Sequence, residues 1–175
     1  DLLIYYQAGF PDDPDLVVDT VLEVANTAFA DSDIDLQLNV AGLVSLDIPT
    51  ELQETLLPKM RRGESPFSTI EADRSFYDAD LAVALLHSVP EDDDACGIAN
   101  VGVYQGLPWR GGFASTVLWQ PGGSSDDGSF CPETTFAHEI GHLLGSLHER
   151  RIAGASAHRP QQSMSRCASS FPTAL

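Results

Sequence analysis

The chain has 175 residues, 43% of them hydrophobic, so it can bury a core large enough for one domain without a framework of disulfides. Nine basic residues against 26 acidic ones give a formal net charge of −17. This balance argues against nucleic-acid and polybasic membrane-surface partners, because both need cationic patches. The chain contains no run of 18 apolar residues, so we expect no membrane insertion. It begins at Asp1 without a signal peptide, and we interpret it as a mature or trimmed product from which a leader, and any pro-segment, have been removed.

The first half of the chain alternates between strand and helix patterns. The apolar run 2–6 predicts a core strand, and apolar residues at helical spacing predict a helix over 15–30. Strict alternation of apolar and polar residues predicts a strand with one covered face over 34–40. A short helix is expected over 50–60. The continuous apolar run 81–86 predicts a strand that is buried on both faces.

In the second half, glycine, proline and acidic residues separate the remaining elements. Residues 98–104 and 113–119 predict two further strands. Pro132 suits the first turn of a helix that should extend to about Leu144, and the sequence after Gly145 is irregular. With no repeat and no linker in the chain, we predict a single α/β domain over 1–175 with a mixed sheet and few long helices.

The last expected helix carries a metal-binding pattern. His138 and His142 are four residues apart, so they differ by about 40° in direction and about 6 Å in rise, and both imidazoles face one point. This spacing suits two ligands of a zinc ion. Glu139 lies about 100° around the helix, beside the metal, where it can accept a proton from an activated water. Gly145 can end the helix in a left-handed conformation, which lets the chain fold back and bring in His148 as a third ligand.

Three histidine ligands leave one position of a tetrahedral zinc ion open, which is typical of catalytic rather than structural sites. Two other interpretations compete with a catalytic one. The histidines could be solvent-facing residues of an ordinary helix, although apolar residues surround them in the sequence. The chain could also be a non-catalytic zinc domain that acts as a binding module, although such a module would have no need of Glu139, which is not a ligand.

The extended motif from His138 to His148 resembles the metzincin clan of zinc endopeptidases. The resemblance implies an α+β zincin-like fold with a twisted mixed sheet and two main helices in an upper subdomain of about residues 1–145. A small irregular lower subdomain of about residues 146–175 would follow the zinc helix. It also implies a methionine turn beneath the ligands, for which Met164 is the candidate and a simple core methionine the alternative. The implied function is a secreted, monomeric zinc endopeptidase with peptide or protein substrates.

Within the clan, three segments are most similar to bacterial reprolysin-like enzymes, including the peptidyl-Asp metalloendopeptidases: 80–86, 96–99 and 135–138. Glu149 after the third histidine is shared with astacins, but Arg166 stands where astacins have a tyrosine. Arg166 is also the candidate for a cationic specificity pocket that favours acidic side chains. An exposed surface arginine is the alternative.

The chain has three cysteines, and their number does not decide the compartment: one disulfide and one thiol fit a secreted protein, three thiols a cytosolic one. The reprolysin-like resemblance implies a disulfide between Cys96 and Cys131 that brackets the edge strand and the entrance of the active site. The alternative is a pairing of Cys131 with Cys167. The resemblance further implies that an extended peptide pairs with an antiparallel edge strand within 97–104.

Two acidic loops, 91–94 and 126–127, offer oxygen ligands for a calcium ion. The competing interpretation is that these residues are solvated loop residues without a metal. The expected cofactor is therefore one catalytic Zn²⁺, with Ca²⁺ as a secondary option.

Overall fold

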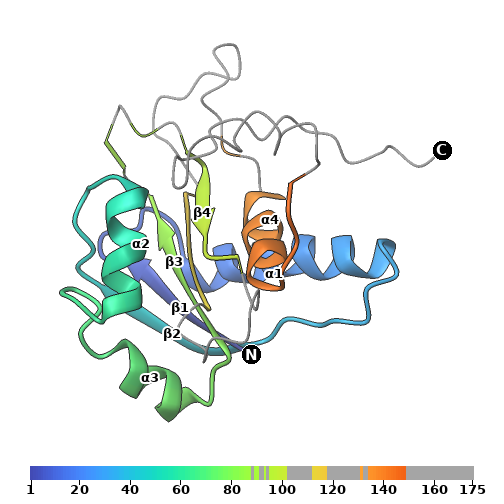
Figure 1. The fold of residues 1–175 in the computed structure, drawn as a ribbon, viewed down its shortest axis with the longest axis horizontal. Coiled ribbons are helices and arrows are strands. Elements are labelled where there is room, and N and C mark those ends of the chain that lie inside the picture. The colour runs from blue at the N-terminus through green and yellow to red at the C-terminus, as the bar shows by residue number, and fades with distance from the viewer. Residues whose placement is uncertain are drawn as a thin grey trace.

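The computed structural model describes residues 1–87, 89–90, 93, 95–101, 112–117, 131 and 134–148. Within these residues, five strands form one mixed sheet in the order β2-β1-β3-β5-β4 (Figure 1). Four of the strands run parallel to one another, and β4 pairs with the last of them, β5, in the antiparallel direction at one edge. The strands are β1 (Leu2–Gln7), β2 (Val40–Leu46), β3 (Leu81–Leu86), β4 (Gly97–Ala99) and β5 (Phe113–Val117).

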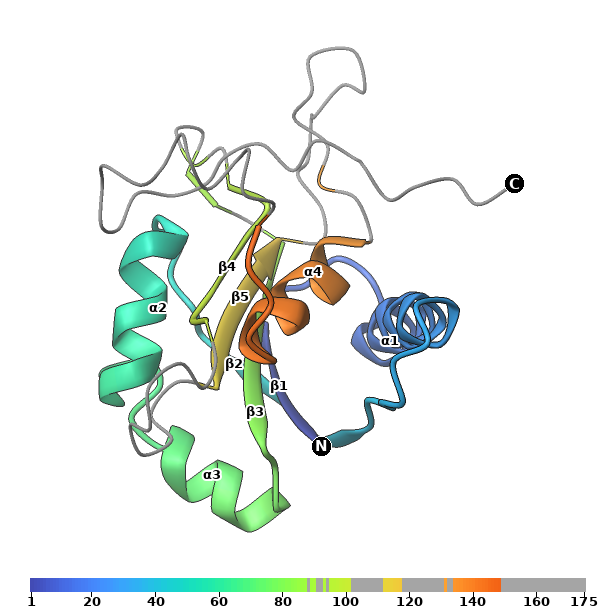
Figure 2. The same cartoon turned by 45° about the vertical axis from the view of Figure 1, so that its right-hand side comes forward.

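Helices cover both faces of the sheet (Figures 1 and 2). On one face lie α1 (Pro14–Asp31) and α4 (Thr134–Leu143), which contact each other. On the other face lie α2 (Gln53–Arg62) and α3 (Ile70–Tyr77). Alternate residues of the strands enter one or the other of two buried clusters, as the two-residue period of a strand requires. The α/β architecture with a mixed sheet confirms the fold class that the sequence predicts.

The central strand β3 shows this arrangement most clearly. All six of its side chains are buried, which confirms the strand predicted over 81–86. Val83 and Leu85 pack with α1 and α4, whereas Ala84 and Leu86 pack with α2 and α3. A strand covered by helices on both faces has no polar side, and this explains its continuous apolar sequence.

The helix predicted over 15–30 is also confirmed, as α1. Asp13 caps its first turn, with its side chain accepting a hydrogen bond from the Asp15 backbone N–H. Pro14 occupies the first position, where its missing N–H costs nothing. Val21 and Phe29 are among the buried residues that repeat at helical spacing and fix this helix on the sheet.

The strand predicted over 34–40 is wrong, because β2 begins only at Val40. The side chain of Asn26 in α1 hydrogen-bonds both backbone groups of Leu38. It donates to the Leu38 carbonyl at 3.1 Å and accepts from the Leu38 N–H at 2.7 Å. The N–H of Leu36 bonds within a local turn, to the carbonyl of Ile34 at 2.8 Å. These backbone groups are therefore not available for hydrogen bonds to a neighbouring strand, although apolar and polar side chains alternate over 34–40.

Other element boundaries differ from the predictions by a few residues. The helix expected over 50–60 is α2, and α3 was not predicted. The expected strands 98–104 and 113–119 correspond to β4 and β5, which end earlier within the described residues. Pro132 and residues 149–175, with most of the proposed lower subdomain, lie outside the described residues.

No helix among the described residues is both long enough and apolar enough to span a lipid bilayer.

Candidate metal centre

Helix α4 carries the predicted metal-binding pattern and is fixed by one apolar face. Phe136, Ile140 and Leu143 are buried in the cluster that α4 shares with α1 and the sheet. These residues follow helical spacing, so they determine how α4 is rotated about its axis. His138 and His142 are thereby held on a side of the helix that faces away from this cluster.

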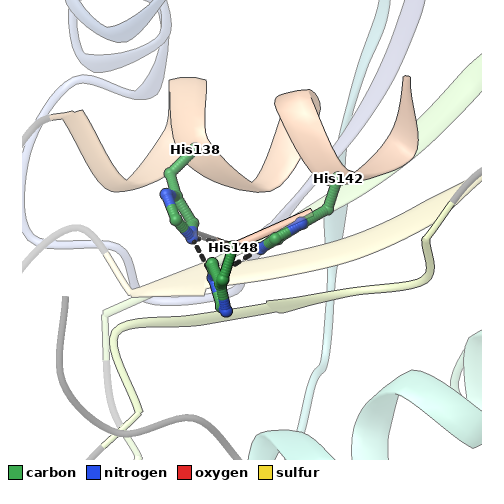
Figure 3. A group of neighbouring side chains, drawn as sticks. All are labelled: His138, His142 and His148. Carbon is green, nitrogen blue, oxygen red and sulfur yellow. Dashed lines mark hydrogen bonds between the residues drawn. The ribbon is translucent and has the colours of Figure 1, made fainter. Parts of the chain in front are cut away.

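The end of α4 turns the chain back toward these two histidines. Gly145 has a φ of 98°, which is the left-handed region that glycine enters without strain. Its N–H donates to the carbonyl of His142 at 2.9 Å, closing the last turn. Three residues later the side chain of His148 comes to lie next to those of His138 and His142 (Figure 3). The structure thus brings together the three residues that the sequence predicts as ligands.

The three imidazoles meet through their Nε2 atoms. The Nε2 atom of His148 lies 2.9 Å from that of His138 and 2.9 Å from that of His142. The Nε2 atoms of His138 and His142 are 3.1 Å apart. Hydrogen bonds alone cannot explain this triangle. Each Nε2 atom of a neutral imidazole is either a donor or an acceptor, so at least two of the three atoms have the same role and cannot bond to each other. A shared cation resolves the conflict, since all three atoms can then present lone pairs.

The size of the triangle fits a zinc ion. Three nitrogens bound at about 2.0–2.1 Å to one tetrahedral zinc lie roughly 3.4 Å apart, so shifts of only a few tenths of an ångström are needed. The Nδ1 atom of His142 lies 2.8 Å from the carbonyl oxygen of Ser146. A carbonyl only accepts, so Nδ1 carries the hydrogen and Nε2 is left with a lone pair. The backbone thus fixes the tautomer that a metal requires.

Burial also keeps the ligands unprotonated. It lowers the pKa of His138 to about 4, with further lowering from the neighbouring His142 and His148. The pKa of His148 is lowered as well, first by burial and then by His142. A histidine binds a metal ion through its neutral form, so a lowered pKa leaves these side chains ready to bind at neutral pH.

Glu139 lies between the two helical histidines in sequence but does not belong to the triangle. Its side chain is buried against β4, with only 4% of the residue exposed, and burial raises the pKa of Glu139 to about 8. The cause of this shift is desolvation, because burial disfavours the charged carboxylate. A cation bound nearby would act in the opposite direction and favour the carboxylate.

A disulfide joins the segment before β4 to the segment before α4, the helix that carries Glu139. Cys96 immediately precedes β4 and Cys131 lies three residues before α4, and the two are bonded to each other. This is the pairing that the reprolysin-like resemblance implied. Cys167, the partner in the alternative pairing, lies outside the described residues, as do Met164, Glu149, Arg166 and the acidic pair at 126–127.

Sequence reasoning missed a buried network on the opposite side of β5. Gln53 donates through its side-chain amide to the carbonyl of Ala95 and accepts from the hydroxyl of Ser115 at 3.0 Å. Asp93 accepts from the backbone N–H groups of Gln53 at 2.7 Å and Ala95 at 3.2 Å. One carboxylate of the candidate calcium loop 91–94 is therefore buried as a cap of α2, and the network holds the segment that leads into β4.

A comparison with protein families identifies this arrangement. The family described as metallo-peptidase family M12B, reprolysin-like, matches residues 17–149. The chain belongs to this family. The match confirms the resemblance to reprolysin-like metzincins, and the narrower peptidyl-Asp subtype stays a prediction. A search of curated proteins finds no similar sequence at a significant level.

Two solved structures are similar to this M12B reprolysin-like domain. A chain in the structure of a chaperone–substrate complex is 17% identical, with a TM-score of 0.65 over 86% of this chain, and supports the fold alone. The present chain spans only 24% of that protein. Archaemetzincin from Methanopyrus kandleri is 14% identical, with a TM-score of 0.48, over 86% of this chain and 76% of its own.

Membership in this metallopeptidase family and the histidine triangle together imply that the domain binds zinc. His138, His142 and His148 form the one group of three or more ligand-type side chains found together among the described residues.

Proposed function

We propose that this M12B reprolysin-like domain is a zinc-dependent endopeptidase in which Glu139 is the general base. One observation carries the proposal: three imidazole nitrogens converge on one point, and the helix that supplies two of them also carries a buried carboxyl group, Glu139, that does not belong to this group. A site that served only to bind zinc would gain nothing from this group, because burial of a carboxyl group is unfavourable.

Each residue has a separate task in this proposal. His138, His142 and His148 would hold the zinc ion, which when bound acts as a Lewis acid and activates water for attack on the peptide carbonyl. Glu139 accepts a proton from the attacking water at a carboxylate oxygen. It later gives that proton to the amine of the leaving peptide. The neutral amine then departs and Glu139 is again a carboxylate.

The sheet supplies a place for the substrate. Strand β4 is paired only on its β5 side among the described strands, and it contacts α4. We propose that an extended peptide pairs with β4 in the antiparallel direction, so that backbone hydrogen bonds place the scissile bond beside the histidines. The antiparallel pairing of Gly97–Ala99 with β5 supports this role, because it leaves β4 as the edge strand.

We further propose that the domain acts outside the cell. A disulfide in a structure of this size is typical of oxidising compartments. Titration of thiols in the denatured protein should find one, because the chain has three cysteines and two are joined. Three titratable thiols in protein purified under non-reducing conditions would contradict an extracellular location.

The alternative is a zinc-binding module without catalysis, and cleavage itself separates the two. The purified, zinc-loaded chain should cleave casein and members of a peptide library internally, lose this activity on chelation and regain it when zinc is restored. Cleavage that persists after zinc has been removed would contradict the metal requirement. A zinc-loaded chain that cleaves no peptide would instead favour the binding module.

A further inference from the structure

Gly97, the first residue of β4, lies directly against the side chain of Glu139. A Cβ atom placed on Gly97 would be 2.7 Å from Glu139 Cγ, 2.8 Å from Oε1 and 2.9 Å from Cδ. Cβ atoms do not approach other heavy atoms this closely in folded proteins. The three nearest atoms all belong to Glu139, so the missing side chain of Gly97 is the space that this carboxyl group occupies.

We propose that Gly97 is the positioning residue for Glu139: because it has no side chain, the edge strand closes over the carboxyl group and holds it between β4 and α4. This inference rests on the proposed function, since it explains how the general base is oriented. It assigns to the edge strand a second task besides substrate pairing, which is to restrict the position of Glu139.

The strand cannot move away to make room for a larger residue. Its backbone is bonded to β5, with the N–H of Val117 donating to the carbonyl of Cys96 at 2.8 Å and Gly97 in register with Thr116. Cys96 is also tied by its disulfide to Cys131, close to the start of α4. A methyl group at position 97 would therefore displace the side chain of Glu139 rather than the strand.

The direction of the clash decides which kinetic constant changes. Side chains of a strand project from the faces of the sheet, whereas partner strands bind at its edge. A methyl group at position 97 points at Glu139 on the α4 face and leaves the free edge of β4 unchanged. A displacement of about 1 Å in a catalytic group costs about 100-fold in rate, so Gly97→Ala should lower kcat by about that factor and change KM by less than about threefold.

Two glycines of the chain provide matched controls for the same substitution. A Cβ on Gly141 in α4 would have no neighbour closer than 3.9 Å among the residues that the structure describes, so Gly141→Ala should keep the activity. A Cβ on Gly42 in β2 would lie 2.6 Å from the ring of Tyr77. Gly42→Ala should thus lower the melting temperature as Gly97→Ala does, with kcat per folded molecule unchanged.

A double-mutant cycle tests the contact without reference to activity. Gly97→Ala should lower the melting temperature by roughly 3–10 °C in the wild-type background, as expected for one excess methyl group in a packed site. In a Glu139→Ala background the clashing atoms Cγ, Cδ and Oε1 are gone, so the same substitution should lower it by less than about 2 °C. The double variant also remains measurable if Gly97→Ala alone does not fold.

The outcomes separate this inference from the proposed function. Equal loss of melting temperature in both backgrounds, or an unchanged kcat in Gly97→Ala, would overturn the positioning role. Coupling between the two sites together with a fall in kcat and an intact zinc content would support it. If the zinc-loaded chain cleaves nothing while the cycle still shows coupling, the contact stands and the proposed peptidase function fails.

Discussion

Two groups of buried polar side chains lie on opposite faces of β5, and they differ in how their hydrogen bonds are satisfied. On the α2 side, Gln53, Asp93 and Ser115 bond to one another and to the backbone. On the α4 side, Thr116, Thr135 and Glu139 are buried, and the two hydroxyls have no hydrogen-bond partner among the described residues. We refer to these groups as the α2-side cluster and the α4-side cluster.

The strand itself produces this separation. Successive side chains of β5 point to opposite faces, so Ser115 meets α2 and Thr116 meets α4. A satisfied cluster stabilises the fold, whereas unsatisfied buried groups reduce its stability and call for another explanation. The α4-side cluster lies on the face of β5 that packs against α4, the helix that carries His138 and His142. The difference teaches that β5 carries a satisfied network on its α2 face and packs on its other face against the helix of the predicted zinc ligands.

The distinction between the two faces of β5 depends most strongly on zinc binding by the three histidines on the α4 side. His142→Ala removes one of three ligands and should lower the affinity for zinc by more than about 100-fold, beyond the usual cost of losing an outer-shell partner. Cleavage should be lost with the metal. Zinc titration and peptide cleavage measure both. His87→Ala is the control, because His87 packs on Phe10 and does not belong to the group of three histidines, so this variant should retain the metal. Tight zinc binding by His142→Ala would refute the site.

Removal of Gln53 tests the α2-side cluster. Gln53→Ala leaves the carbonyl of Ala95 and the hydroxyl of Ser115 buried without a partner, so the free energy of unfolding should fall by roughly 2–4 kcal/mol. Denaturant unfolding measures this loss. Gln37→Ala, at an exposed position, should change it by less than about 0.5 kcal/mol. A loss of similar size in both variants would remove the structural role of the cluster.

The pH dependence of stability tests the α4 side after chelation of the metal. Glu139 has a pKa raised to about 8, so its protonated form favours the fold and its contribution declines as the pH rises toward 8. His138 has a pKa lowered to about 4, so its contribution is complete above about pH 6.5 and declines below it. Between pH 6.5 and 8, therefore, the contribution of Glu139 to stability changes with pH and that of His138 does not.

The melting temperature of the chelated protein should therefore fall between pH 6.5 and 8. Glu139→Gln, which does not titrate, should flatten this fall. Thermal unfolding across the interval decides the matter, and an equal slope in both proteins would place the titrating group elsewhere.

The smallest effect is expected for the unsatisfied hydroxyls. Thr116→Val keeps the shape of the side chain and removes a buried hydroxyl that has no partner within the described part of the chain, so the free energy of unfolding should stay the same or rise by about 1 kcal/mol. Ser115→Ala on the opposite face should instead lower it by about 1 kcal/mol, because it breaks the bond to Gln53. The two substitutions at adjacent residues thus have opposite expected signs. A loss of stability in Thr116→Val would show that its hydroxyl has a partner after all.

The parts of the site that depend on local geometry could be predicted from the sequence. The spacing of His138 and His142 fixes their relative direction on any helix, and Gly145 signals where that helix ends. The third ligand follows within a few residues. The central strand was predictable for a similar reason, because burial on both faces leaves a continuous apolar run.

What could not be predicted depends on contacts between distant segments. Alternation over 34–40 predicted a strand, but Asn26 bonds to the backbone there. Gln53 was not distinguished in the sequence because its partner Ser115 is 62 residues away. The sequence places Gly97 in an edge strand and indicates nothing more, since its close approach to Glu139 depends on the packing of β4 on α4. Such roles carry no periodic signal.

The central claim is that Glu139 acts in catalysis and not in metal binding, and Glu139→Gln tests it most directly. The substitution keeps the size of the side chain and removes its ability to take a proton. We expect one zinc ion per chain as in the wild type, and a kcat lowered by about 10²–10⁴-fold. Glu54→Gln, at an exposed position on α2, should leave both quantities unchanged. A Glu139→Gln variant that cleaves peptides at the wild-type rate with zinc bound would contradict the account.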